Sequence, residues 1–433
     1  MKIFMATMGL DIGGAETHIV ELSKELKARG HEVVIASNGG VYVPEVTAAG
    51  IRHYSVPMNR RSVKNMMRSR ALLKDILRKE KPDIVHAHAR IPAFLCGTLQ
   101  GSLKFPFVTS CHGVFEVSGV LKLLSNWGER TLAVSEDIRD YLVREYGVPA
   151  EHITLTINGI DTNKFSPDVS GEAVRKEFDL GDGVVIGHVS RLDQAACHTA
   201  RQLIELAPRL DGAYPGIHIL ITGGGDSFEQ LKERAEQVNR DLGRTCVVLT
   251  GPRTDVNAIA AGQVFVGVSR SALEAMAEEK PVVLSGAQGH TGLFCPELLQ
   301  KAIDTNFCCR TDPVADEETL YRAVTQALDL LQEEKQRLGA YGRQTVQTYY
   351  SVQRMAQDCL DVYEQVRRRK YRVVMSGYYG FSNAGDDAIL QSIHEGILAA
   401  SKDISVTVLS NDPQLTWNLC GLEAVPRFHF WKV

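Results

Sequence analysis

The sequence lacks the long apolar segment that a membrane-spanning helix requires. Such a helix needs about 20 consecutive apolar residues, and no run in this chain approaches that length. The short apolar run from Lys2 to Thr7 meets Gly9 at once and is too short for a signal peptide. We therefore expect a cytoplasmic protein, either soluble or held peripherally at the inner face of a membrane.

Paired cysteine motifs and an excess of positive charge are also absent. The nine cysteines are scattered apart from Cys308 and Cys309, and no Cys-x-x-Cys spacing occurs. This pattern favours reduced thiols over a disulfide framework or a zinc site. The net charge of −4 argues against a dedicated nucleic-acid binder, and a charged content of 23% is ordinary for a soluble protein.

Apolar strand-like runs alternate with helical patterns along most of the 433 residues. The first third contains such runs at residues 3–6, 32–36, 83–87 and 106–110, and a second series starts near Val184. Alternation of this kind predicts doubly wound parallel sheets in an α/β fold. Because a turn-rich linker at residues 158–167 separates the two series, we expect two domains with a ligand cleft between them.

One strand–turn–helix segment carries the strongest indication of chemistry. Residues 264–268 resemble a strand, and a short helix is expected from Ser271. The start of such a helix directs free N–H groups and a partial positive charge at the turn, where an anion can bind. Glu274 would lie in the first turn and accept hydrogen bonds from hydroxyl groups beside that anion. Alternatively, Ser271 and Glu274 form a capping box that only begins the helix, and both interpretations can hold together.

The run Leu-Glu-Ala-Met-Ala at residues 273–277 resembles the nucleotide-sugar site of the retaining glycosyltransferases of family 4, or group 1. The resemblance covers roughly residues 1–368. It implies the GT-B fold, with two doubly wound Rossmann-like domains at 1–166 and 167–350 and a crossover helix at 351–370 that returns to the first domain. In that family, the glutamate equivalent to Glu274 holds the ribose hydroxyls of the donor.

Further motifs of this family occur in the expected order. Gly13, Gly14 and Glu16 match a loop that faces the acceptor and the donor phosphate. His112, which follows a buried strand, matches a histidine that touches the donor sugar. A lone histidine is more often structural, and His86 and His88 are interpreted as polar residues at the sheet edge rather than metal ligands.

In the second domain, Arg191 matches the family's arginine that binds the diphosphate, where a forked cation stabilises the leaving group. Gly224 lies in a turn that the resemblance places near the nucleotide base. Two departures are evident: no lysine follows Arg191 within residues 193–198, where Arg201 is the nearest cation, and Val266 replaces a glutamate that reads the sugar. Ser269, Arg270 or backbone amides are the candidates to substitute for that glutamate. Because the missing lysine removes one of two cations on the diphosphate, at a cost of about 2–4 kcal/mol, we expect activity to be reduced, redirected or absent.

The expected site needs no metal, because Arg191 and the helix start at Ser271 would neutralise the departing nucleotide diphosphate. It needs no cofactor either, and a nucleotide-diphosphate sugar is the co-substrate. The catalytic candidates are His112, Arg191 and Glu274, and the donor-binding candidates are Gly13, Gly14, Glu16, Gly224, Ser269, Arg270 and Ser271.

Residues 60–81 combine nine basic residues with two acidic ones and interleaved apolar side chains. A basic amphipathic helix could rest on anionic lipid and reach a lipid-linked acceptor. The equal alternative is a surface helix that packs on the sheet and keeps its charged side in water.

The last segment, residues 371–433, departs from a lone glycosyltransferase. Its run from Gly377 to Asp387, Gly-Tyr-Tyr-Gly-Phe-Ser-Asn-Ala-Gly-Asp-Asp, resembles the opening of the polysaccharide pyruvyl transferases. About 63 residues are too few for such an enzyme, and one βαβ unit cannot bury both faces of its sheet, so we expect a truncated fusion.

These patterns predict a glycosyltransferase that moves a sugar from a nucleotide sugar to a glycan or lipid-linked acceptor in cell-envelope or polysaccharide synthesis, with retention of configuration. A silent GT-B binding module and a pyruvyl transferase fusion that uses phosphoenolpyruvate are the alternatives. The base, the sugar and the acceptor stay open.

Overall fold

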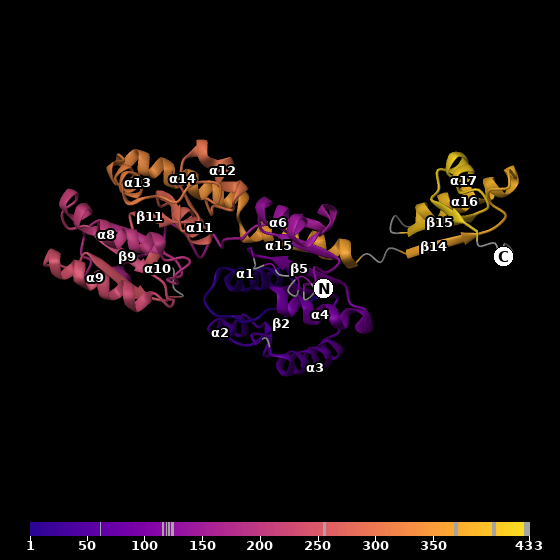
Figure 1. Cartoon of the computed structure of the whole chain (residues 1–433), viewed down its shortest axis with the longest axis horizontal. Helices are drawn as coiled ribbons and strands as arrows, with labels where there is room; N and C mark the ends of the chain where they lie inside the picture. Colours follow the sequence, from indigo (N-terminus) through magenta and orange to yellow (C-terminus); the bar gives the residue numbers. More distant parts are fainter. Residues whose placement is uncertain are drawn as a thin grey trace. The chain divides into compact units, whose positions relative to one another are not determined.

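The computed structural model describes the chain except for residues 61, 115–116, 118, 120–121, 123–124, 254–256, 368–370, 401–403 and 428–433. It divides into two compact units, Met1–Tyr363 and Glu364–Val433. In the first unit, helices surround two separate sheets (Figure 1). The sequence-based domain boundaries at 166 and 350 fall in connections, between β7 and α7 and between α14 and α15.

Seven parallel strands form the first sheet, in the order β3-β2-β1-β4-β5-β6-β7. The strand order reverses at β1, which pairs with β2 on one side and with β4 on the other, and this opens a crevice at the carboxyl ends. The strands are β1 Lys2–Ala6, β2 Glu32–Ser37, β3 Arg52–Ser55, β4 Ile84–His88, β5 Phe107–Cys111, β6 Arg130–Ala133 and β7 Ile153–Leu155. The helices are α1 Gly14–Ala28, α2 Val43–Ala48, α3 Val63–Glu80, α4 Arg90–Leu103 and α6 Glu136–Tyr146, with the 3₁₀ turn η1 Ala150–His152.

The second sheet has six strands in the order β10-β9-β8-β11-β12-β13, and only β13 runs antiparallel to its neighbour. Here the order reverses at β8, so the turns after β8 and β11 lie beside the crevice. The strands are β8 Val185–Val189, β9 His218–Thr222, β10 Val247–Gly251, β11 Val264–Gly267, β12 Val282–Gly286 and β13 Gly289–Leu293. The helices are α7 Glu172–Glu177, α8 His198–Ala213, α9 Phe228–Leu242, α10 Asn257–Ala260, α11 Ser269–Ala277, α12 Leu299–Asp304, α13 Glu317–Asp329 and α14 Gln332–Tyr349, with the 3₁₀ turn η2 Pro296–Leu298.

The helix α15 Val352–Arg367, most of which belongs to the first unit, packs against the first sheet. Its Tyr363 is fully buried, and the Tyr363 hydroxyl lies 2.6 Å from Nδ1 of His86 in β4. Just before α15, Ser351 forms an isolated parallel bridge with Ile160. The chain therefore crosses between the two sheets twice at one place. We call the part of the first unit around the first sheet the first lobe and the part around the second sheet the second lobe. Residues 158–160 lie where these two lobes meet.

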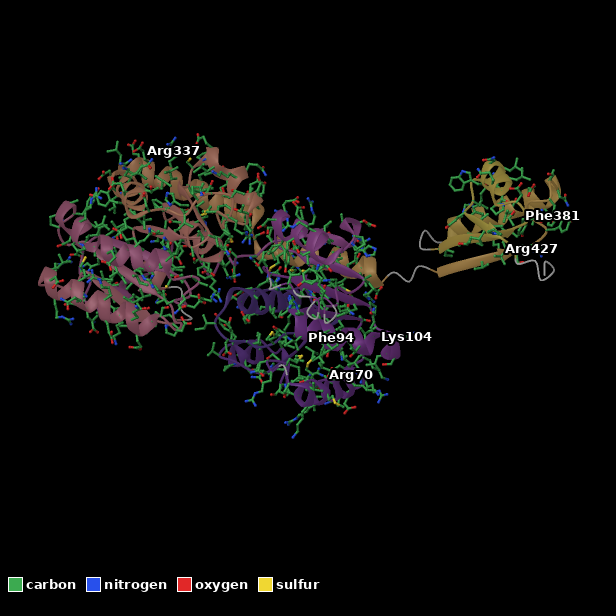
Figure 2. The ribbon with its side chains drawn as sticks, viewed as in Figure 1. Arg70, Phe94, Lys104, Arg337, Phe381 and Arg427 are labelled. Carbon is green, nitrogen blue, oxygen red and sulfur yellow. The ribbon has the colours of Figure 1, made fainter. Side chains whose placement is uncertain are left out.

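The second unit contains one small parallel sheet in the order β14-β15-β16. Its elements are β14 Tyr371–Ser376, α16 Ala384–Ala400, β15 Ile404–Ser410, α17 Pro413–Cys420 and β16 Ala424–Pro426. Met375, Val408 and Leu390 belong to its small core, whereas Val374 and Val425 are 61% and 40% exposed. Phe381, labelled in Figure 2, stacks on Tyr378 with ring centroids 4.0 Å apart.

Among the described residues, the helices are all too short or too polar to cross a bilayer. Their apolar sides instead build the cores: Leu73 and Leu77 of α3 are buried in the cluster that includes Phe4 and Phe107.

A candidate active site where the two lobes meet

Four histidines from the first lobe form one cluster at the carboxyl edge of its sheet. His88 is the last residue of β4 and His86 is its middle residue, His112 follows β5, and His18 lies in α1. Nδ1 of His88 lies 3.0 Å from Nε2 of His112, and the rings of His18 and His112 are centred 4.6 Å apart. Sequence reasoning found His112 but missed His18, because its spacing in α1 resembles that of an ordinary core position.

The cluster is buried deeply enough to keep its imidazoles neutral at pH 7. Burial lowers the pKa of His86 to about 3 and that of His112 to about 4. Burial, together with the neighbouring histidines, also lowers the pKa values of His18 and His88 well below the ordinary value. Neutral rings both donate and accept hydrogen bonds, as recognition of sugar hydroxyls requires.

His86 and His88 were interpreted as polar residues at the sheet edge, but the structure shows them buried among specific partners. His86 is held between Tyr363 and Ser110, at 2.6 Å and 2.7 Å, so both of its nitrogens have partners. His88 is 1% exposed and lies among three other histidines, and its Nε2 has no partner within the described part of the chain.

The start of α11 differs from the sequence expectation. The helix begins at Ser269, two residues earlier than predicted, and Val268 is its N-cap without a side-chain hydrogen bond. Ser269 has a positive φ of 54°, and its N–H donates to the carbonyl of Phe307 at 2.7 Å. The proposed capping box is therefore wrong: Ser271 lies inside the first turn, and its hydroxyl donates back to the carbonyl of Val268 at 3.1 Å.

Glu274 consequently lies in the second turn of α11, where its partner is Arg270. Nε of Arg270 donates to the Glu274 carboxylate at 2.8 Å, and the two side chains are only 10% and 13% exposed. Burial raises the pKa of Glu274, while the charge of Arg270 opposes that rise. Arg270 also donates from Nη1 to the carbonyl of Gly159 at 3.1 Å, whereas its Nη2 is buried without a partner among the described residues.

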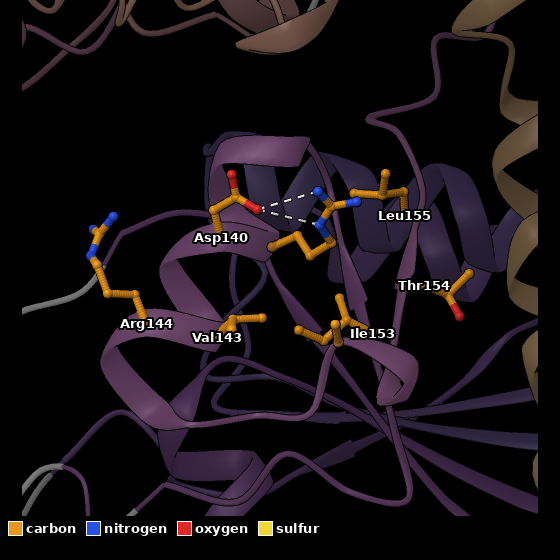
Figure 3. Close-up of a pocket in the computed structure, with 8 residues that line it drawn as sticks. Asp140, Val143, Arg144, Ile153, Thr154 and Leu155 are labelled. Carbon is orange, nitrogen blue, oxygen red and sulfur yellow. Dashed lines mark hydrogen bonds and ion pairs between the residues drawn. The ribbon is translucent and has the colours of Figure 1, made fainter.

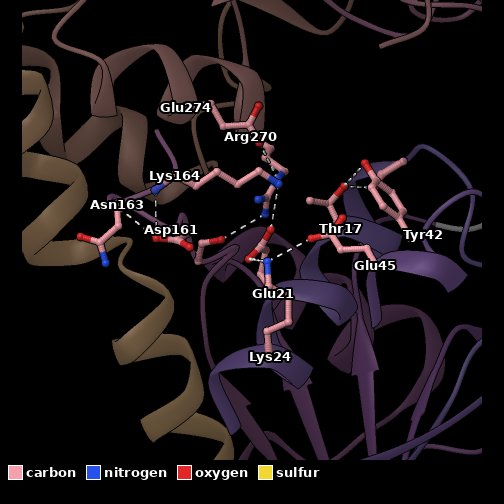
Figure 4. A network of polar contacts seen from close by, with 12 residues as sticks. Thr17, Glu21, Lys24, Tyr42, Glu45, Asp161, Asn163, Lys164, Arg270 and Glu274 are labelled. Carbon is pink, nitrogen blue, oxygen red and sulfur yellow. Dashed lines mark hydrogen bonds and ion pairs between the residues drawn. The ribbon is translucent and has the colours of Figure 1, made fainter. Parts of the chain in front are cut away.

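A chain of charges continues from this pair into the first lobe (Figure 4). Lys164, from the connecting segment, lies 3.3 Å from the carboxylate of Glu21 in α1, and Lys24 lies 3.4 Å from its other oxygen. The charge of Lys164 also lowers the pKa of Glu274. Sequence reasoning missed Glu21 and Lys164, because their spacing alone suggested a helix surface and a structural hinge.

Arg191 follows β8 at the other side of the crevice. Its side chain is 73% exposed, and its guanidinium lies 3.3 Å from the carboxylate of Asp193. The charge of Arg191 also acts on Glu16, whose pKa is raised mainly by burial and lowered in part by Arg191. An exposed cation whose charge also reaches Glu16 of α1 is suited to bind a phosphate group.

Gly13, just before α1, lets the carboxylate of Glu16 lie close to the backbone. α1 begins at Gly14 with Gly13 as its N-cap, and a Cβ on Gly13 would overlap a carboxylate oxygen of Glu16. Glu16 accepts a hydrogen bond from its own backbone N–H. Its carboxylate therefore lies at the start of α1, where the helix dipole favours a negative group.

The glycine turn after β9 supports the loop that carries Arg191. A Cβ on Gly223 would overlap the carbonyl oxygen of Ser190, and one on Gly225 would overlap the backbone of Leu192. Both glycines have a positive φ, of 151° and 157°. The predicted donor-binding residue Gly224 accepts a hydrogen bond from the N–H of Leu192 at 2.9 Å, so its carbonyl holds this loop in place.

The two departures from the family pattern have clear locations. Val266 is buried in β11 and belongs to the core cluster of the second lobe, while its carbonyl accepts a hydrogen bond from Nδ1 of His188 at 2.8 Å. Arg201 lies 3.7 Å from the sulfur of Cys197. Arg270 is therefore the buried cation beside Glu274, whereas Arg201 contacts a cysteine.

A separate shallow groove of about 710 Å³ lies beside α6 and β7 (Figure 3). Its two arginines are paired with carboxylates on their own helix, Arg139 with Asp140 and Arg144 with Glu145. The groove includes none of the predicted site residues, so it does not form part of this site.

Two family models match the chain in the order of its two lobes. Residues 12–164 match Glycosyltransferase Family 4, and residues 183–329 match Glycosyl transferases group 1. Together they span more than half of the chain. The chain belongs to the group 1 glycosyltransferases.

Curated relatives of this glycosyltransferase include a component of human phosphatidylinositol N-acetylglucosaminyltransferase, 26% identical over 60% of this chain and 55% of the human protein. The Escherichia coli enzyme named UDP-Gal:α-D-GlcNAc-diphosphoundecaprenol α-1,3-galactosyltransferase is 27% identical over 59% of this chain and 72% of the relative. The chain spans about half the length of the first relatives that it matches.

Among solved structures, HepE of Anabaena in complex with UDP superposes with a TM-score of 0.66 at 16% identity, over 84% of this chain and all of that one. This likeness confirms the predicted GT-B fold.

Proposed function

We propose that the chain transfers a sugar from a nucleotide-diphosphate sugar to a cell-envelope or polysaccharide acceptor, with retention of configuration. One observation carries the proposal. Arg270 pairs with Glu274 in α11 and donates to the carbonyl of Gly159, and its charge also lowers the pKa of His18. A donor held at the start of α11 would therefore face the histidine cluster of the other lobe.

The leaving nucleotide diphosphate needs positive charge, which three features supply. Arg191 is exposed, Arg270 has a buried N–H group without a partner among the described atoms, and α11 begins at Ser269, where the helix dipole is positive. We assign Arg191 and Arg270 as the pair of cations that neutralises the diphosphate. Losing one of two such cations costs about 2–4 kcal/mol of leaving-group stabilisation, so Arg270 would restore what the missing lysine removes.

Two relatives support the classes of donor and acceptor. The E. coli relative is named for a UDP sugar and a diphosphoundecaprenol acceptor, and the human relative is named for phosphatidylinositol. We propose a lipid-linked or glycan acceptor whose hydroxyl enters on the leaving-group face, guided by His112. The anomeric configuration of the product, measured by NMR, tests retention; an inverted product would contradict it.

A thermal-shift screen with UDP-, GDP-, ADP- and CMP-sugars tests the donor site directly. A ligand at 100 times its dissociation constant stabilises the folded state by about 2.7 kcal/mol, which is a readily measured rise in melting temperature. At least one nucleotide sugar is expected to produce that rise. No rise with any of them would contradict the proposal.

A silent binding module is the alternative that Val266 favours, because a buried valine cannot replace a glutamate that reads the sugar. The screen and a hydrolysis assay separate the two functions. Binding with slow hydrolysis or transfer supports an enzyme, whereas binding without either supports the silent module.

For the second unit, we propose the opening of a pyruvyl transferase-like fold with phosphoenolpyruvate as donor. The support is its separate β–α–β arrangement and its tight turn, where the side chain of Asn383 accepts from the N–H of Gly385 at 3.1 Å and donates to Asp386 at 2.5 Å. The residues present are not expected to bind phosphoenolpyruvate alone, which calorimetry with phosphoenolpyruvate checks.

A further inference from the structure

The histidine cluster has a property that sugar binding does not require. His18, His88 and His112 can each present one ring nitrogen so that all three nitrogens lie within 4.8 Å of one another. On each ring, one buried nitrogen has no partner among the described atoms: Nε2 of His18, Nε2 of His88 and Nδ1 of His112. Three imidazoles that approach this closely, each with one nitrogen that lacks a partner among the described atoms, form a ligand set of the kind that Zn²⁺ and related ions prefer.

We propose that His18, His88 and His112 form a binding site for a transition-metal ion of the zinc class, and that the bound ion excludes the donor sugar. The exclusion rests on the proposed function, because His112 is the residue expected to touch that sugar. The ion acts as an inhibitor, and transfer itself needs no metal.

The surroundings of His18 resemble those of a prepared metal ligand. Its Nδ1 lies 3.2 Å from the side-chain oxygen of Asn158, which accepts the Nδ1 proton and leaves the lone pair of Nε2 free. Metal-binding histidines commonly donate their second nitrogen in this way, which fixes both the tautomer and the ring orientation. Asn158 also belongs to the segment where the two lobes meet.

We expect an ion to reach the cluster past His112, the least buried of the three ligands. His112 is half-buried, whereas His18 and His88 are 0% and 1% exposed. With three protein nitrogens as ligands, a tetrahedral ion keeps one open position for water. His86 is excluded from the ligand set, because both of its nitrogens already have partners.

Two features set a moderate affinity. A neutral imidazole has a single N–H, so an ion bound by both His88 and His112 breaks the 3.0 Å hydrogen bond between them. In addition, the guanidinium of Arg270 acts electrostatically on His18 and disfavours a second cation. We therefore expect micromolar rather than nanomolar binding, and Arg270→Gln should tighten it.

Calorimetry with Zn²⁺ alone on the full chain, freed of metal by a chelator, tests the site without any nucleotide. One Zn²⁺ per chain is expected in the micromolar range. His18→Ala, His88→Ala and His112→Ala should each weaken it at least tenfold, while the exposed His152→Ala serves as the matched control and should leave it unchanged. Equal Zn²⁺ affinity in all four variants would overturn the proposal, because binding would then be to surface histidines.

Cobalt absorption guards against variants that fold poorly. Co²⁺ bound by the wild-type chain should give the intense visible bands of a four-coordinate site, which six-coordinate aqueous Co²⁺ lacks. His112→Asn is the conservative variant, and it should lose those bands while melting at the same temperature without metal. Weak bands in the wild-type chain would overturn the assignment.

Competition completes the test. Zn²⁺ should lower the affinity for whichever of the UDP-, GDP-, ADP- or CMP-sugars binds, and a chelator should restore it. Zn²⁺ binding that the histidine variants abolish but that leaves sugar-nucleotide affinity unchanged would overturn the exclusion. Failure of every nucleotide sugar to bind would instead contradict the proposed function, and the calorimetry would still decide the metal site.

Discussion

At the scale of single residues, Arg191 and Arg270 carry the same charge in opposite surroundings. The Arg191 side chain is 73% exposed, whereas that of Arg270 is 10% exposed and is paired with Glu274. An exposed cation is easily removed without damage to the core, but removing a buried partner leaves an unpaired charge. Arg191 is therefore tested by its own substitution, whereas the buried pair is tested through Glu274.

Arg191→Ala should weaken nucleoside-diphosphate binding by about tenfold or more and leave the melting temperature within about 1 °C, because an exposed cation contributes little to stability. Calorimetry with UDP or GDP, whichever binds, measures the first effect. The equally basic Arg201→Ala is the matched control and should change neither. Unchanged affinity in Arg191→Ala would remove this residue from the site.

Glu274→Ala should reduce affinity for a nucleoside diphosphate more than affinity for pyrophosphate, because its proposed partner is ribose. The substitution also leaves Arg270 without its carboxylate, so a fall in stability of roughly 1–3 kcal/mol is expected as well. Glu274→Gln keeps a hydrogen-bond acceptor and serves as the control for packing. If both ligands weaken equally in the two variants, the role of Glu274 is structural.

Glu278 gives a prediction for pH. It is 3% exposed, neither carboxylate oxygen has a partner among the described residues, and burial raises its pKa to about 8. The folded state therefore holds a proton that the unfolded state releases above about pH 4.5, so stability falls as the pH rises towards 8. Lys280 opposes this rise in pKa, and Glu274 adds to it.

Glu278→Gln should remove that loss, which amounts to roughly 2–4 kcal/mol between pH 5 and pH 8.5. Urea unfolding at a series of pH values measures it. Glu279→Gln, at a half-buried neighbouring position, is the control and should keep the wild-type pH dependence. An identical pH dependence in all three proteins would show that Glu278 is not protonated in the folded state.

At the scale of elements, the burial pattern of α3 bears on whether this helix packs on the sheet or contacts a membrane. Its buried Leu73 and Leu77 pack on the core of the first lobe, as expected for a surface helix. Its first turns differ: Val63 is 75% exposed, Met67 is 69% exposed, and Lys64 and Arg68 are exposed beside them. Only this end of the helix retains the pattern of a lipid-contacting surface.

We predict that the pair Lys64→Glu and Arg68→Glu lowers binding to vesicles that contain anionic phosphatidylserine by about tenfold or more, since each basic residue near such a surface contributes about 1 kcal/mol. Vesicle sedimentation measures the binding. The pair Arg78→Glu and Lys81→Glu changes the charge equally at the other end of the helix and is the control. Equal loss in both pairs would indicate net charge rather than a docking surface, and no binding by the wild type would exclude peripheral contact through α3.

At the scale of the whole molecule, the division into two units falls at residues 363–364, within α15. The buried side of α15 belongs to the first unit through Tyr363 and His86. A chain that ends at Lys370 should therefore keep both the nucleotide binding and the melting temperature of the first unit, because its core is already complete. Melting curves and nucleotide titrations of the two lengths check this, and loss of either in the shorter chain would make the tail an integral part of the enzyme.

Much of the architecture was predictable from the sequence, because it depends on local periodicity. Buried parallel strands appear as short apolar runs, so β1, β2, β4 and β8 were recognisable within a few residues of their bounds. The motif around Glu274 and the positions of Arg191 and His112 at strand ends followed from the same order of elements. The glycine-rich turns could also be recognised in the sequence. The sequence did not show at which of these glycines a side chain would overlap the backbone.

Only the tertiary structure decided which residues meet. His18, His88 and His112 are separated by up to 94 positions, and Arg270 lies 111 positions from Gly159, so no local spacing relates them. α11 begins at Ser269, whose N–H donates to the carbonyl of Phe307, 38 residues later. Local propensity determines which segments form strands and helices, whereas the order of strands in each sheet determines which side chains share a site.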